Sequence, residues 1–223
     1  MDATIFDFDG VVVDSEPIHL AAFQQVLAPS GITMSAESYY AKYLGYDDRD
    51  AIRACAADQG VSVPDERLAE LIDAKTGVVQ EMFARGIEPL DGAVELIQAA
   101  RDAGVPVAVC SGALRAEIEQ AARAVGVWDC FDVVTAAEDV DRGKPDPCGY
   151  ELTLRQLAAK RGAPLSAQRC VVVEDSPAGV DAAHAAGMRV LAVTNSYPPE
   201  ALGAAECVVE SLQDVDLDVL GSL

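Results

Sequence analysis

The stretch that decides the fold is Thr4-Ile5-Phe6-Asp7-Phe8-Asp9-Gly10, in which an apolar run meets two carboxylates and a glycine. Similar runs, rich in Val, Ile or Phe, recur along the chain and are each predicted to be a buried strand. Together the predicted strands are 4–8, 105–110, 131–135, 170–173 and 190–193. Helical patterns separate them, so the sequence predicts an α/β fold in which helices cover both faces of a parallel sheet.

One connection is too long for this alternation. About seventy residues separate the first strand from the helix before the second, and a structureless loop of that length is rare. Apolar residues at helical spacing predict four helices instead, at 17–28, 35–44, 48–59 and 64–84. We therefore expect a core of residues 1–14 and 85–223, and an inserted helical subdomain of residues 15–84 with a hinge at its joints.

Composition narrows the class of protein. The 223 residues include 37 acidic and 16 basic side chains, a formal net charge of −21, which argues against binding to nucleic acid or an anionic membrane. No apolar run reaches the ~18 residues of a membrane span, and the N-terminus lacks a signal-peptide pattern, so we expect a cytoplasmic protein. The six cysteines form no CxxC pair, and nothing in the sequence requires more than a monomer.

Polar side chains follow the predicted strands where each strand ends. Two acids at alternate positions, Asp7 and Asp9, would share one side of an extended chain. The other motifs are Ser111-Gly112, Lys144 in the sequence GKPDP, and Glu174-Asp175. Because the carboxyl ends of parallel strands meet at one edge, we expect four acids, a hydroxyl and a lysine to gather there. Such oxygens suit Mg²⁺, and Ser111 with Lys144 suits a phosphate.

Taken singly, each motif has a structural alternative. Paired aspartates can be held by cationic partners alone. Ser111 can be the N-cap of the following helix. Lys144 can be an ordinary surface lysine.

Taken together, the four motifs resemble the haloacid dehalogenase superfamily of phosphohydrolases, in its β-phosphoglucomutase-like and phosphoglycolate phosphatase-like branch. The motifs are DFDG at 7–10, Ser111, Lys144 in GKPDP, and EDSPAG at 174–179, in the family's order and spacing over nearly the whole chain. The resemblance implies a Rossmann-like core, and it implies that the inserted subdomain is a helical cap.

The resemblance also implies a catalytic role for each motif. Asp7 is the nucleophile and forms an aspartyl-phosphate. Asp9 protonates the leaving oxygen and then acts as general base towards water. Ser111, Gly112 and Lys144 bind the phosphoryl oxygens.

A Mg²⁺ ion is implied by the same resemblance. Its ligands would be the carboxylate of Asp7, the backbone carbonyl of Asp9 and the carboxylate of Asp175, with Glu174 assisting directly or through water. The ion would let an anionic phosphate approach a chain of charge −21.

Two cap residues, Arg49 and Lys75, match positions that face the active site in the β-phosphoglucomutase-like branch, and His19 matches a histidine near the hinge of that branch. We expect them to bind the substrate. Lys75 lies on the apolar stripe of its helix, where the alternative is a side chain that snorkels past the stripe. Arg49 is expected on the inner side of its helix, with a surface arginine as the alternative. His19 can instead be an interfacial imidazole with hydrogen-bonded partners.

The sequence departs from β-phosphoglucomutase at the site that binds a second phosphate, and this bears on whether the chain is a phosphatase or a mutase. Where the mutase has a serine and a lysine that bind a second phosphate, this chain has Ala113 and Leu114, followed by Arg115, which could substitute in another register. These changes favour a phosphatase of a small phosphorylated metabolite, such as a sugar phosphate, over a sugar phosphomutase. Asp9 argues against a dehalogenase, because true dehalogenases lack the second aspartate. A phosphonatase uses a cap lysine to form an imine, so the presence of Lys75 leaves that activity as an alternative. A non-catalytic binding module is the remaining alternative.

Overall fold

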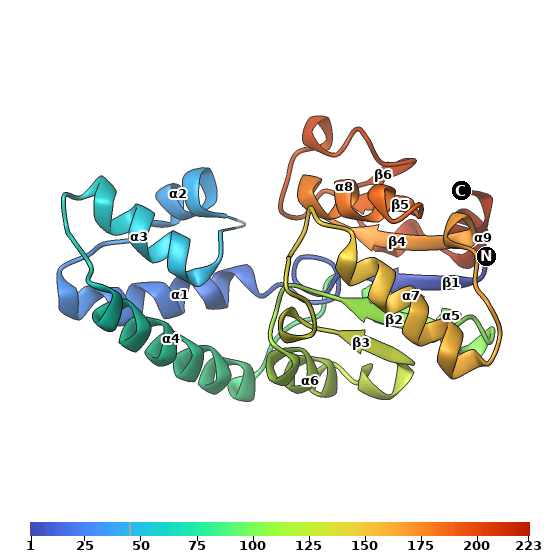
Figure 1. Cartoon of the computed structure of the whole chain (residues 1–223), viewed down its shortest axis with the longest axis horizontal. Coiled ribbons are helices and arrows are strands. Elements are labelled where there is room, and N and C mark those ends of the chain that lie inside the picture. The colour runs from blue at the N-terminus through green and yellow to red at the C-terminus, as the bar shows by residue number, and fades with distance from the viewer. Residues whose placement is uncertain (45) are drawn as a thin grey trace. The chain divides into compact units, whose positions relative to one another are not determined.

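The computed structural model describes residues 1–44 and 46–223, and these form two compact units (Figure 1). The core unit consists of Met1–Asp14 and Ile87–Leu223, and the cap unit consists of Ser15–Gly86. No helix within the described residues is both long enough and apolar enough to span a membrane.

The core unit is built on a six-stranded parallel sheet in the order β3-β2-β1-β4-β5-β6. The strands are β1 Ala3–Phe6, β2 Val107–Cys110, β3 Val133–Thr135, β4 Cys170–Glu174, β5 Arg189–Val193 and β6 Cys207–Val209. The α/β fold predicted from the sequence is thereby confirmed. The sixth strand was not predicted, because three residues between two glutamates are too short to show a strand pattern.

Helices cover both faces of this sheet. The core helices are α5 Ala93–Asp102, α6 Arg115–Ala124, α7 Cys148–Arg161, α8 Pro177–Ala185 and α9 Leu217–Ser222. Side chains of α7 and α8 pack on Ile5 and Val172 of the sheet, and α7 crosses in front of it in Figure 1. Every residue of β1, β2 and β4 is buried, which requires a layer on each face.

Strand register brings the ends of three strands level. Phe6 pairs with Val109 of β2 and with Val173 of β4. Asp7 directly follows β1 and Glu174 is the last residue of β4, so the two acids lie at neighbouring strand ends. They flank the point between β1 and β4 where the strand order reverses, which is where ligands bind in open α/β sheets.

The chain turns one residue after β1, earlier than the sequence suggested. Backbone N–H groups of Val12 and Val13 donate to the carbonyl oxygen of Phe8, at 2.8 and 3.2 Å, and close the turn. The extended conformation on which the shared side of Asp7 and Asp9 was predicted therefore ends before Asp9.

The core chain closes on itself where the cap unit is inserted. Val13 forms an antiparallel bridge with Pro89. On either side of it, the Asp14 N–H donates to the Glu88 carbonyl at 3.3 Å and the Leu90 N–H donates to the Val12 carbonyl at 3.0 Å. The two ends of the insertion are thus joined by the core itself.

The cap unit is helical. Its helices are α1 Glu16–Leu27, α2 Ala36–Ser38 with a π-helical continuation Tyr39–Tyr43, α3 Asp48–Asp58 and α4 Asp65–Arg85. These match the four predicted segments to within about one residue at each end. Its hydrophobic core includes Phe23, Leu27, Ile52, Leu68 and Leu71.

Two helical glycines differ sharply in their surroundings. A Cβ atom on Gly179 of α8 would lie 1.7 Å from Oε1 of Glu174, whereas a Cβ atom on Gly77 of α4 would have no atom within 4 Å. The start of α8 therefore packs against the end of β4 only because residue 179 has no side chain.

Gly179→Ala is expected to lower the free energy of unfolding by about 1–3 kcal/mol, the usual cost of overpacking. Gly77→Ala should instead raise it by about 0.5–1 kcal/mol, because alanine favours a helix. Urea unfolding of both variants checks this. Unchanged stability of Gly179→Ala would mean that Glu174 moves aside at little cost.

Candidate active site

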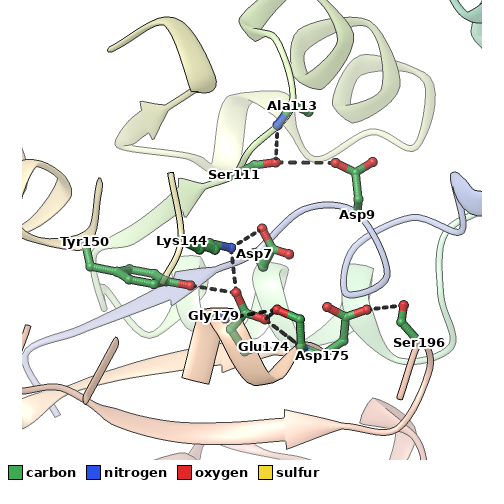
Figure 2. Close-up of polar contacts among 11 residues, drawn as sticks. Asp7, Asp9, Ser111, Ala113, Lys144, Tyr150, Glu174, Asp175, Gly179 and Ser196 are labelled. Carbon is green, nitrogen blue, oxygen red and sulfur yellow. Dashed lines mark hydrogen bonds and ion pairs between the residues drawn. The ribbon is translucent and has the colours of Figure 1, made fainter. Parts of the chain in front are cut away.

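Lys144 occupies the centre of the polar cluster at the ends of β1 and β4. Its Nζ lies 2.7 Å from Oδ1 of Asp7 and 2.5 Å from Oε1 of Glu174 (Figure 2). The lysine side chain is only 18% exposed, and the ring of Tyr150 lies 5.4 Å from Nζ. The interpretation of Lys144 as an ordinary surface lysine is therefore wrong.

Glu174 is completely buried and uses both of its oxygens. Oε1 accepts from Lys144 and from the Tyr150 hydroxyl, at 2.9 Å from the latter. Oε2 accepts from the N–H groups of Asp175 and Ser176, at 2.9 and 3.0 Å, and from the Ser176 hydroxyl at 3.0 Å. A carboxylate has about four lone-pair positions, so this one is saturated. Glu174 is better suited to holding Lys144 than to binding a metal directly.

Asp9 and Ser111 face each other on the other side of Asp7. The Ser111 hydroxyl donates to Oδ2 of Asp9 at 3.4 Å and accepts from the N–H of Ala113 at 3.0 Å (Figure 2). Helix α6 begins at Arg115 with Leu114 as its N-cap, so the interpretation of Ser111 as the helix N-cap is wrong. Gly112 is exposed between Ser111 and Ala113.

Asp175 lies at the tip of β4 against residues from two other strand ends. Its Oδ2 accepts a hydrogen bond from the hydroxyl of Ser196, which follows β5 (Figure 2). Gly10 has a φ of 75°, and a Cβ atom there would lie 1.9 Å from that same Oδ2. Glycine is required at position 10 both for this backbone conformation and for this close approach.

Sequence reasoning missed three residues of this site. Ser196 and Asn195 follow β5, and the Asn195 side-chain amide donates to the Gly10 carbonyl at 2.7 Å. The signal was present, since a run of three polar residues, 194–196, follows the strand. Tyr150 gave no such signal, because a tyrosine on an apolar helix face resembles any core aromatic.

The carboxylates of this site carry more charge than Lys144 neutralises. Burial raises the pKa of Asp7 to about 7, in spite of Lys144. Burial, followed by the charges of Asp7 and Glu174, raises the pKa of Asp175 well above its ordinary value. Burial acts in the same direction on Glu174, but Lys144 and two backbone N–H groups hold the pKa of that carboxyl below its usual value. An additional cation would relieve this excess.

The donor set suits a hard divalent cation. Asp7, Glu174 and Asp175 each present an oxygen within 4.8 Å of the others. With Glu174 saturated, Asp7 and Asp175 remain as side-chain ligands. Oxygen-only coordination of this kind fits Mg²⁺.

Arg115 is engaged outside this cluster. Its guanidinium donates to the Val134 carbonyl at 3.0 Å and pairs with Asp139. Glu138 accepts from the backbone N–H of Arg115 and caps the start of α6. A phosphate at Arg115 would have to compete with the carboxylate of Asp139.

Lys75 is buried within the cap unit with its charge paired. Its Nζ lies 2.7 Å from Oδ1 of Asp48 and 2.9 Å from Nδ1 of His19, and 4.9 Å from the centre of the Phe23 ring. The lysine side chain is 5% exposed, so the snorkelling interpretation is wrong. The contact between Lys75 and His19 agrees with the alternative interpretation of His19, in which its imidazole has a hydrogen-bonded partner.

Arg49 is exposed on the first turn of α3, although Ile52 of the same helix is buried. The expectation that Arg49 lies on the inner side of its helix is wrong. Arg49 lies in the first turn, at the end of the helix, and the buried residues of α3 begin only at Ala51.

Comparison with known proteins supports a single family. The sequence profile of the haloacid dehalogenase-like hydrolases matches residues 4–193. Protein CbbY of Rhodobacter capsulatus is 30% identical over 203 residues, 88% of this chain and 87% of that protein. Hexitol phosphatase A of Escherichia coli strain K12 is 31% identical over 215 residues, 95% of this chain and 91% of that protein.

A solved structure agrees over the whole length. A crystal structure of a CbbY mutant from Rhodobacter sphaeroides, in complex with xylulose-(1,5)bisphosphate, superposes with a TM-score of 0.87 at 27% sequence identity. The match covers 99% of each chain.

The metal-free protein should become less stable as the pH rises from about 4 to about 7. Folding raises the pKa of Asp7 from 3.8 to about 7, so between these values the folded state binds more protons than the unfolded state. Mg²⁺ should stabilise the protein more near pH 7.5 than near pH 5, because a metal binds the ionised carboxylate. Thermal unfolding with EDTA or Mg²⁺ measures both effects. Asp7→Asn is the control and should flatten both, whereas equal stabilisation by Mg²⁺ at the two pH values would contradict the expectation.

Proposed function

The chain belongs to the haloacid dehalogenase-like hydrolase family, and on this premise we propose that it is a Mg²⁺-dependent phosphatase of a small phosphorylated metabolite, acting through an aspartyl-phosphate on Asp7. It is an enzyme that hydrolyses phosphoric monoesters. The observation that carries the proposal is the position of Asp7. Its carboxylate lies at the strand-order reversal, in contact with Lys144 and within reach of Asp175.

The residues divide the reaction between them. An oxygen of Asp7 attacks phosphorus, and the bond from phosphorus to the ester oxygen breaks. Asp9 gives a proton to that oxygen as it leaves. In the second step Asp9 takes a proton from water, the water oxygen attacks phosphorus, and Asp7 is released with inorganic phosphate. Lys144 and Ser111 hold the phosphoryl oxygens throughout.

Mg²⁺ would be held by one carboxylate oxygen each of Asp7 and Asp175 and by the backbone carbonyl of Asp9. When bound, it supplies positive charge that offsets repulsion between Asp7 and an anionic phosphate. Glu174, itself fixed by its hydrogen bonds, holds the Lys144 ammonium group next to Asp7.

We propose a sugar phosphate or polyol phosphate as the substrate class. Hexitol phosphatase A and the CbbY complex with xylulose-(1,5)bisphosphate support this class by their names. His19, Arg49 and Lys75, with Gly112 and Arg115, remain our candidates for substrate binding. Of the basic residues in this set, Arg49 is the best candidate to bind an anionic substrate, because Lys75 and Arg115 are already paired with carboxylates.

The pairing of Arg115 also favours a phosphatase over a phosphomutase. A mutase must hold a second phosphate, and Arg115 is the residue that could replace the missing serine and lysine at this place. Its guanidinium is held by Asp139 instead.

Phosphate release from about a hundred phosphomonoesters, with Mg²⁺ or EDTA, tests this function; a broad panel is needed because substrate choice is hard to foresee from a pocket. We expect Mg²⁺-dependent release from one class of ester and none from Asp7→Asn. Release that persists in Asp7→Asn would contradict the nucleophile assignment. Isomerised sugar phosphate that depends on added bisphosphate would favour the mutase.

Asp9→Asn should lower kcat by about 10²–10⁴-fold, because general acid–base catalysis contributes that much. The matched control is Asp14→Asn, an exposed aspartate of the same segment. The rate of phosphate release on the best ester of the panel measures both variants. Equal rates for the two would remove Asp9 from the mechanism.

A further inference from the structure

Ser196 contacts the proposed metal ligand Asp175, and none of the family motifs includes this serine. Its hydroxyl donates to Oδ2 of Asp175. Among residues 1–44 and 46–223 no hydrogen bond engages the other oxygen, Oδ1. In Figure 2 that oxygen points away from Ser196, towards Asp7 and Glu174.

Oδ2 is also enclosed on a second side. It lies 1.9 Å from the position that a Cβ atom of Gly10 would take, and the Ser196 hydroxyl oxygen lies 2.8 Å from that same position. The loop that carries Ser196 is fastened to this place, because the Asn195 side chain donates to the Gly10 carbonyl at 2.7 Å. Asp175 is thus held with one oxygen occupied and one presented to the acid cluster.

This arrangement bears on which ion the site accepts. Ca²⁺ takes six to eight oxygens and readily binds both oxygens of one carboxylate, whereas Mg²⁺ requires near-ideal octahedral geometry with single oxygens. A carboxylate with one oxygen tied to a hydroxyl can bind only through the other. Glu174, saturated by five donors, offers no oxygen to make up the larger coordination number.

We propose that Ser196 is a positioning residue that makes Asp175 a single-oxygen ligand and so makes the site selective for Mg²⁺ over Ca²⁺. The proposal rests on the Mg²⁺ site of the proposed function. It extends that function by assigning the choice of ion to a residue outside the four motifs.

The test is direct metal binding to the substrate-free protein. The electron paramagnetic resonance signal of free Mn²⁺ reports Mn²⁺ binding, and Mg²⁺ and Ca²⁺ are added as competitors. Ser196→Ala is compared with wild type, with Asp175→Asn, and with Ser222→Ala. Ser222 is the matched control, since its hydroxyl donates to the Val219 carbonyl in α9 at 2.8 Å and touches no proposed ligand.

In Ser196→Ala we expect Mg²⁺ affinity to fall about 10–100-fold, the usual effect of removing a hydrogen bond to a metal ligand. Ca²⁺ affinity should fall much less, because the released oxygen can join in binding the larger ion. The ratio of Mg²⁺ to Ca²⁺ affinity therefore drops, while Ser222→Ala keeps the wild-type ratio.

Two results would overturn the proposal while leaving the metal site in place. One is an unchanged affinity ratio in Ser196→Ala. The other is an equal loss for both ions with a lowered Tm, which would indicate a general structural role. Metal binding that is absent from wild type, or unchanged in Asp175→Asn, would instead overturn the Mg²⁺ site itself, and the proposal with it.

Discussion

Unbalanced negative charge at the ends of β1 and β4 is the constraint on which the rest of the structure depends. Strand register places Asp7 beside Glu174, and Asp175 follows directly. Removing a carboxylate from water costs several kcal/mol unless donors replace the water. Those donors include Lys144, the hydroxyls of Tyr150 and Ser196, and the backbone N–H groups of Asp175 and Ser176. Burial, together with the negative charge that these donors leave unbalanced, raises the pKa values of Asp7 and Asp175. The same excess of negative charge makes the site suitable for a cation.

Local signals in the sequence predict the fold and the acids, the serine and the lysine of the four motifs, but not Tyr150 and not how the members of the site pair. An apolar run that stops at an acid is visible in the sequence, and parallel topology then collects such ends at one edge. Nothing local indicates that Glu174 is saturated, because two of its donors, Lys144 and Tyr150, lie 30 and 24 residues earlier. Nor does anything local indicate that Gly10 packs so closely against Asp175, 165 residues later, that no side chain fits at position 10.

The same limit applies to the cations. A lysine or arginine in the sequence looks available to a phosphate, but its nearest carboxylate in space decides whether it is. Lys75 is paired with Asp48, 27 residues away, and Arg115 with Asp139, 24 residues away. Lys144 differs because its partners are themselves part of the site. Chemical type is thus read from sequence, whereas electrostatic availability comes from tertiary structure.

The bridge between Val13 and Pro89 has an evolutionary consequence. The core chain is hydrogen-bonded to itself across the insertion point. The residues inserted there therefore contribute no strand to the sheet and do not affect its topology. Segments of other lengths or folds can be inserted at the same point of the chain without changing the order of the strands. The inserted helical unit and the core unit can therefore diverge at different rates within one polypeptide.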